Sequence, residues 1–244
     1  MPKLSLEQLQ AKANDIRKVI IRITTEAGSG HPSSSLSATG ATDNTAIYNS
    51  AGFFSFDEIM TIRKLGSPWE GHPNMRRLPG IEASTGSLGQ GLSLGVGHAL
   101  AGRMDQRDYR VYVMMGDGEM GEGQIWEAIA TAHKYKLGNL TAIIAQNGYQ
   151  QTGATKDVLD LTEFQPKLEA FGWHVQTING NNMAEVVKAL DAVQKVADRP
   201  TAIVSKTRKG FGILPVLETT GDLNYHGKPL SKELAEKALA HLGG

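Results

Sequence analysis

The sequence predicts an α/β fold of three layers, with a mostly parallel sheet between two layers of helices. Two observations lead to this prediction. From Tyr109 onward, short apolar stretches alternate with amphipathic stretches, and turn residues separate them. The chain has 244 residues, of which 40% are hydrophobic, so it is large enough to enclose a sizeable core within one α/β domain.

The expected elements follow one another in a regular order. Ser5 and Gln8 form a capping-box signature at the start of an N-terminal helix, which glycine and proline end at 28–32. Strands are expected at 109–115, 140–146, 173–178 and 201–207. Helices are expected at 122–135, 162–172, 182–196 and 231–242. Asn182 and Glu185 form a second capping-box signature.

The segment 87–104 is unusually rich in glycine for a helix. Gly91 and Gly95 are four residues apart, as are Gly89 and Ser93, so on a helix they give a smooth face. Glycine inside a helix costs up to about 1 kcal/mol relative to alanine, which suggests a reason in packing or binding. We expect another backbone to approach this face closely, and the candidate is a second subunit.

The composition excludes several classes of function. The chain has 25 basic and 25 acidic residues, which gives no electrostatic reason to expect a nucleic acid or an acidic membrane as partner. It has no cysteine, so a bound metal must take oxygen or nitrogen ligands. No signal peptide is recognisable, and no apolar run approaches the roughly 18 residues that span a bilayer. We therefore expect a cytoplasmic protein.

One motif, at 116–121, decides the class of ligand. It reads as the dinucleotide fingerprint G-x-G-x-x-G at a strand-to-helix turn. However, the carboxylates of Asp117 and Glu119 would repel a pyrophosphate in that turn. The next strand ends in Gln146 and Asn147, so it offers no acid for a ribose hydroxyl. These charges disfavour a nicotinamide-binding protein.

A hard divalent cation explains an aspartate in this turn, because it can lie between the carboxylate and phosphate oxygens. The following strand ends at the same sheet edge, where Asn147 offers an amide oxygen and Tyr149 a main-chain oxygen. The sequence therefore predicts that Asp117, Asn147 and Tyr149 hold Mg²⁺ or Ca²⁺ against a diphosphate. The alternative is a structural turn aspartate and a capping asparagine.

The G-D-G turn followed by an asparagine one β-α-β unit later resembles the metal motif of thiamine diphosphate enzymes. The chain as a whole resembles the N-terminal, diphosphate-binding section of transketolases, as in split two-subunit members of that family. The matching segments occur in the family's order: Gly30-His31-Pro32, the IRKLGS of 62–67, Gly71-His72-Pro73, 84–91, the GDGEMGEGQIWEA of 116–128, and Tyr225-His226-Gly227.

The resemblance implies roles for individual residues. The implied catalytic residues are His31, His72, Glu122 and His226. The implied contacts to thiamine diphosphate are Gly86, Ser87, Leu88, Asp117, Gly118, Glu119, Asn147 and His226. For each histidine the alternative is a packing or surface residue. For Glu122 and Glu127, which point in different directions on a helix, it is favourable charge near a helix start.

We interpret residues 1–244 as one thiamine diphosphate-binding domain, shortened around 38–52, where the family has a further helix, strand and histidine motif. The resemblance implies two-carbon ketol transfer between sugar phosphates, as in the pentose phosphate pathway. It also implies a separate C-terminal subunit that carries the pyrimidine-binding domain, assembled as a dimer of heterodimers. Two alternatives stay open: a thiamine enzyme acting on a modified ketose, and a non-catalytic regulatory paralogue.

Overall fold

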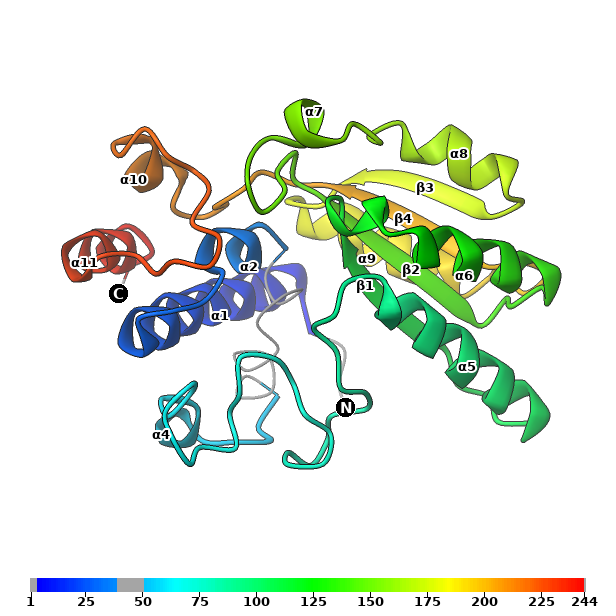
Figure 1. The fold of residues 1–244 in the computed structure, drawn as a ribbon, viewed down its shortest axis with the longest axis horizontal. Coiled ribbons are helices and arrows are strands. Elements are labelled where there is room, and N and C mark those ends of the chain that lie inside the picture. Colours follow the sequence, from blue (N-terminus) through cyan, green and yellow to red (C-terminus); the bar gives the residue numbers. More distant parts are fainter. Residues whose placement is uncertain (1–3, 39–50, 244) are drawn as a thin grey trace. The chain divides into compact units, whose positions relative to one another are not determined.

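The computed structural model describes residues 4–38 and 51–243 (Figure 1). The chain divides into two compact units. The first, here called the helical unit, comprises Met1–Gly86 and Arg208–Gly244. The second, the sheet unit, is Ser87–Thr207. Each unit has a hydrophobic core of its own.

The sheet unit is built on four parallel strands. They are β1 (Val111–Gly116), β2 (Leu140–Gln146), β3 (His174–Asn179) and β4 (Thr201–Lys206). Their order across the sheet is β1-β2-β4-β3, so β4 pairs between two strands that precede it in the chain. All four predicted strands are confirmed, with ends within two residues of those expected.

Helices cover both faces of this sheet (Figure 1). The helices of the sheet unit are α5 (Gln90–Met104), α6 (Gly123–Lys134), α7 (Thr155–Val158), α8 (Phe164–Ala170) and α9 (Met183–Val193), with a 3-10 turn η1 (Glu119–Gly121). Ala142 and Ile144 of β2 face a core shared with α5, α6 and α8. Ile143, between them, faces the core made with α9. This alternation confirms the predicted three-layer α/β fold.

The helical unit packs its helices around an aliphatic core that includes Ile20, Ile23 and Leu217. Its helices within the described ranges are α1 (Leu6–Ala27), α2 (Pro32–Ala38), α4 (Phe56–Ile59), α10 (Leu214–Glu218) and α11 (Lys232–His241). The capping box of Ser5 and Gln8 is confirmed at the start of α1. No helix within 4–38 and 51–243 has the length and apolar character needed to cross a membrane.

The second capping box is only half confirmed. The Asn182 side chain caps α9, because its oxygen accepts the backbone N–H groups of Ala184 and Glu185. The expected reciprocal bond is wrong: the Glu185 carboxylate accepts from the backbone of Asn179 and from the side chain of Asn182. The Glu185 carboxylate therefore accepts the backbone N–H at the end of β3, in place of the backbone N–H of Asn182. The predicted shortening around 38–52 lies mostly in 39–50, outside the described residues.

The glycine face of α5 meets the chain's own sheet. A Cβ at Gly95 would lie 2.4 Å from Cγ2 of Val113 in β1, which is too close for real atoms. At Gly95 the close approach is made by the Val113 side chain of β1, and the predicted subunit contact at this face stays a prediction. Gly97, two residues further along α5, has open space where its side chain would be.

This difference gives a matched pair of substitutions. We expect Gly95→Ala to lower the free energy of unfolding by about 1–3 kcal/mol, because it overpacks the contact between helix and strand. Gly97→Ala is expected to raise it by up to about 1 kcal/mol, since alanine favours the helix and meets nothing. Urea denaturation of the two variants measures both changes. Equal effects at the two positions would contradict the assignment.

Candidate functional site

Asp117 directly follows β1 and is only 3% exposed. Its Oδ1 accepts the N–H of Gly118 at 3.0 Å, which fixes the turn after β1. Its Oδ2 accepts the N–H of Gly148 at 2.7 Å, which lies in the turn after β2. The buried carboxylate therefore joins the carboxyl ends of two adjacent strands, where ligands bind in open parallel sheets.

Asn147 and Tyr149 lie in the turn that Asp117 holds. The Asn147 Oδ1 accepts the N–H of Tyr149 at 3.0 Å, and Gly148 between them has the left-handed φ of 79° that this turn requires. The turn is closed by a bond from the N–H of Thr155 to the carbonyl of Gly148 at 2.9 Å. The predicted metal residues thus come from two turns that one carboxylate joins.

Asp117, Asn147 and Tyr149 offer oxygen atoms of the kinds that suit a hard cation. Carboxylate, amide and carbonyl oxygens are the donors that Mg²⁺ and Ca²⁺ prefer. Among the described residues, histidines and acids form no group of three or more that could hold a metal. The residues that could hold a cation beside Asp117 are therefore Asn147, through its amide oxygen, and Tyr149, through its main-chain oxygen.

Glu119 makes a second connection at this edge of the sheet unit. Its Oε1 accepts the N–H of Gly89 at 2.9 Å, and its Oε2 accepts the N–H of Gly116 at 3.2 Å. Gly89 is buried, with φ of 84°, and a Cβ there would lie 2.9 Å from Cβ of Glu122. The Glu119 carboxylate, which is predicted to contact the cofactor, thus anchors the loop that carries Ser87 and Leu88.

We expect Glu119→Gln to loosen this loop. An amide keeps one acceptor oxygen but turns an NH₂ group toward the second backbone N–H, so one buried donor loses its partner. This costs about 1–3 kcal/mol in the free energy of unfolding. Glu127→Gln is the matched control, because the Glu127 side chain is exposed on α6. Urea denaturation tests the pair, and equal stability of both variants would refute this role of Glu119.

Three further predicted residues of the sheet unit, Ser87, Leu88 and Glu122, are exposed to solvent. Ser87 is exposed, and Leu88 is an apolar side chain with 56% of its surface exposed. Glu122 is the residue before α6 and is exposed, and its side chain makes no hydrogen bond or ion pair within the described part of the chain. These side chains are therefore accessible to a ligand or a partner.

The helical unit brings two of the predicted histidines together. The rings of His31 and His226 lie 4.5 Å apart between centroids. Nδ1 of His226 is 3.4 Å from the hydroxyl of Ser34, in the first turn of α2. Residues 192 positions apart in the sequence thus meet in one cluster, as expected of a shared site.

His72 is seated against Gly86. A Cβ at Gly86 would lie 2.5 Å from Cγ of His72, and Gly86 has φ of 134°. Only glycine satisfies both the conformation and the space. The His72 ring therefore packs directly against the backbone of Gly86, which is a predicted cofactor residue.

The electrostatics of this cluster keep two imidazoles neutral. Burial, followed by the positive groups of His226, Arg63, His72 and Lys209, lowers the pKa of His31 to about 4. Burial and then Lys209 lower the pKa of His226 below its usual value. Near pH 7 both rings are uncharged and can each accept one hydrogen bond and donate another.

Three further residues at these sites were not predicted. Gly148 is an Asn-Gly turn signal in the sequence, but its bond to Asp117 requires the pairing of β1 with β2. Lys209 is only 3% exposed, although its surroundings in the sequence read as a loop. Arg63 has a left-handed backbone, with φ of 61°, which no sequence signal indicates.

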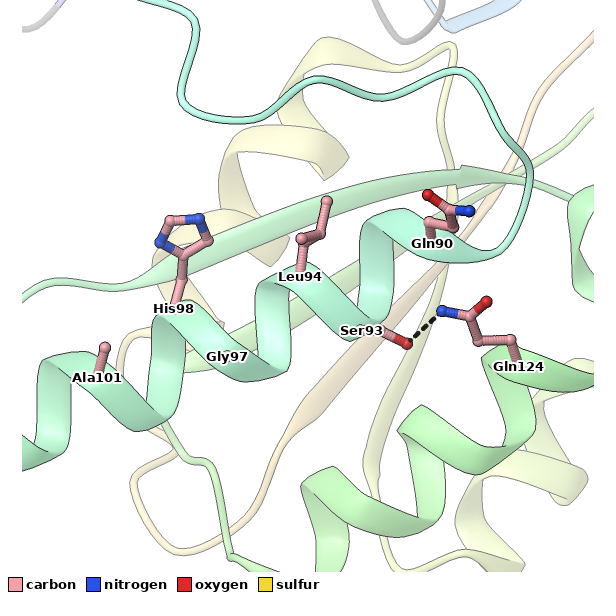
Figure 2. Close-up of a pocket in the computed structure, with 7 residues that line it drawn as sticks. All are labelled: Gln90, Ser93, Leu94, Gly97, His98, Ala101 and Gln124. Atoms are coloured by element: carbon pink, nitrogen blue, oxygen red, sulfur yellow. Dashed lines mark hydrogen bonds between the residues drawn. The ribbon is translucent and has the colours of Figure 1, made fainter. Parts of the chain in front are cut away.

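The sheet unit also has an open groove of about 520 Å³ between α5 and α6 (Figure 2). It is lined by Gln90, Ser93, Leu94, Gly97, His98, Ala101 and Gln124, and the side chains of Ser93 and Gln124 are hydrogen-bonded at 3.0 Å. None of the predicted catalytic, cofactor or metal residues lines it. The groove is therefore separate from the motif that Asp117 organises.

The parallel α/β fold, with a buried carboxylate that joins two adjacent strand ends, is typical of domains that bind a cofactor at that edge of the sheet. Residues 45–243 match the family model of the transketolase thiamine diphosphate binding domain. This chain belongs to the transketolase family and corresponds to its N-terminal section.

Relatives support this assignment. The chain is 40% identical over 185 residues to one subunit of the apulose-4-phosphate transketolase of Phocaeicola vulgatus, a match that covers 76% of this chain and 65% of the relative. It is 39% identical over 191 residues to the 6-deoxy-6-sulfo-D-fructose transketolase subunit SqwG of a Clostridium species, which covers 78% and 68%. The chain thus matches about two thirds of the length of these two relatives.

A solved structure agrees with the sequence relatives. The transketolase of Campylobacter jejuni superposes with a TM-score of 0.88 at 27% identity. The match covers 98% of this chain and 43% of that one. The chain therefore spans less than half of that transketolase.

Proposed function

We propose that this chain is the diphosphate-binding subunit of a split transketolase that transfers two-carbon ketol groups between sugar phosphates. The observation that carries the proposal is the bond from the N–H of Gly148 to Asp117. It holds the G-D-G turn beside the Asn147–Tyr149 turn, so oxygens from both can serve one cation.

In this proposal Asp117, Asn147 and the Tyr149 carbonyl hold Mg²⁺ or Ca²⁺, which neutralises the diphosphate. Gly118, Ser87 and Leu88 contact the cofactor around that anchor. Bound thiamine diphosphate supplies the stabilised carbanion that the two-carbon transfer requires.

The histidines His31, His72 and His226 handle hydroxyl protons of the sugar. The lowered pKa of His31 keeps its ring uncharged near pH 7, so the ring can accept one hydrogen bond from a sugar hydroxyl and donate another. The Ser34 hydroxyl near Nδ1 of His226 helps to fix the orientation of that ring. Glu122, exposed before α6, is proposed to act in a carboxylate network with the partner subunit.

A separately encoded partner completes the site in this proposal. The two relatives described above are each named as one subunit of a transketolase, which supports such a partner. The partner would carry the pyrimidine-binding domain, and two such pairs would form a dimer of heterodimers. Sugar choice then depends on both proteins, since this chain provides the histidines and the diphosphate side and the partner provides the rest of the site.

A modified ketose is the second candidate substrate. The relatives at 40% and 39% identity are named for apulose-4-phosphate and for 6-deoxy-6-sulfo-D-fructose, neither of which is an ordinary ketose phosphate. A non-catalytic regulatory paralogue is a weaker alternative, because the Asp117 motif and the three histidines are all present in the sequence.

Reconstitution tests the proposal. The chain is mixed with a pyrimidine-domain subunit encoded beside it, thiamine diphosphate and Mg²⁺, and ketol transfer is assayed with ordinary and modified ketoses. We expect transfer only when both proteins are present. His31→Gln and His72→Gln are expected to lower kcat/KM by about 100-fold or more, as for loss of a group that moves protons.

His241→Gln is the matched control, because His241 is exposed in the last turn of α11 and belongs to no predicted site. It should leave kcat/KM unchanged. Absence of transfer with every ketose, from a mixture in which both proteins are folded and bind each other, would favour the regulatory paralogue.

A further inference from the structure

Arg63 has a backbone conformation that needs an explanation. Its φ of 61° lies in the left-handed region, which residues other than glycine seldom adopt. The N–H of Arg63 donates to the carbonyl of Trp69 at 2.7 Å. Trp69 is itself buried and packs edge-on against Phe54, at 4.6 Å between ring centroids. The surrounding loop therefore holds Arg63 in this conformation.

The conformation directs the guanidinium to two histidine turns. Nη1 of Arg63 donates to the Ser29 hydroxyl at 3.0 Å, and Nη2 donates to the Gly71 carbonyl at the longer distance of 3.4 Å. Ser29 lies two residues before His31, and Gly71 directly precedes His72. One side chain thus contacts the residue just before the first G-H-P segment and the glycine of the second.

Arg63 is exposed, and its guanidinium lies close to the backbone of Gly71. A Cβ at Gly71 would lie 2.9 Å from Cζ and from Nη2 of Arg63, so the guanidinium lies directly against this backbone. Any residue larger than glycine would displace it. Gly71, having no side chain, therefore leaves the space that the Arg63 guanidinium occupies.

Two other basic residues of this unit, Lys64 and Arg77, form ion pairs with acids. Lys64 forms an ion pair with Glu26 at 3.0 Å, and Arg77 forms one with Glu70 at 2.8 Å. Arg63 forms no ion pair with an acid in the part of the chain that the structure describes. Its guanidinium is one of the positive groups that lower the pKa of His31.

We propose that Arg63 is a positioning residue that fixes His31 and His72 relative to each other by bridging the two turns that carry them. Its importance for ketol transfer rests on the proposed function, but its effect on the two histidines does not. The positive groups that act on His31 are His226, whose ring lies 4.5 Å from it between centroids, Arg63, His72 and Lys209.

The test is a pH titration of the histidine ring signals by NMR on the whole chain, with signals assigned from single His→Gln variants. In Arg63→Met we expect the signals of both His31 and His72 to move. The pKa of His31 should rise, because removing a nearby positive charge makes protonation easier. Arg63→Lys should keep that pKa low but still move the His72 signal, since an ammonium group cannot span both turns.

Arg76→Met is the matched control, an exposed arginine of the same unit whose side chain is not among the groups that act on His31. It should change neither signal. Ser29→Ala removes one contact of Arg63 without altering its charge and should move the His31 signal, so it decides the matter if Arg63→Met does not fold. Unchanged His31 and His72 signals in folded Arg63→Met, or an unchanged His31 signal in Ser29→Ala, would overturn the proposal.

These titrations need neither cofactor nor partner. Shifted histidine signals without ketol transfer in the reconstituted mixture would reject the proposed function and leave the role of Arg63 intact. Ketol transfer with unshifted signals would do the reverse.

Discussion

The buried carboxylate of Asp117 is the constraint on which the sheet unit's site depends. A charged group that is 3% exposed must be satisfied by hydrogen bonds or by a cation. Its two oxygens accept the N–H groups of Gly118 and Gly148, so the ends of β1 and β2 are held together. The position of Asn147 and Tyr149 follows from this connection.

Glu119 extends the same principle to the glycine-rich loop. Its carboxylate accepts N–H groups from Gly89 and Gly116, and so connects the loop before α5 to the end of β1. In the helical unit, glycines have a comparable part, since Gly86 and Gly71 leave room for His72 and Arg63. In the sheet unit, backbone N–H groups bond to the carboxylates of Asp117 and Glu119. In the helical unit, glycine backbones leave the space that His72 and Arg63 occupy.

Local sequence signals predicted the strands and the longer helices, whereas the short helices α2, α4, α7 and α10 were not expected. The strands were recognisable as apolar runs, and Ser5 and Asn182 marked helix starts. The order of the strands was not predictable in this way, because apolar runs do not indicate which strands become neighbours. The same limit applies to the site. The carboxylate of Asp117 was predicted, whereas its bond to Gly148, the fit of Gly95 against Val113 and the conformation of Arg63 all depend on contacts between distant segments.

The most direct measurement of the central claim is the affinity for thiamine diphosphate, by isothermal titration calorimetry with Mg²⁺ and with chelator. The account predicts Mg²⁺-dependent binding that Asp117→Asn weakens at least about 10-fold. Asp157→Asn, at an exposed position in α7, should bind as the unaltered chain does. Equal, metal-independent binding by folded Asp117→Asn and by the unaltered chain would contradict the account.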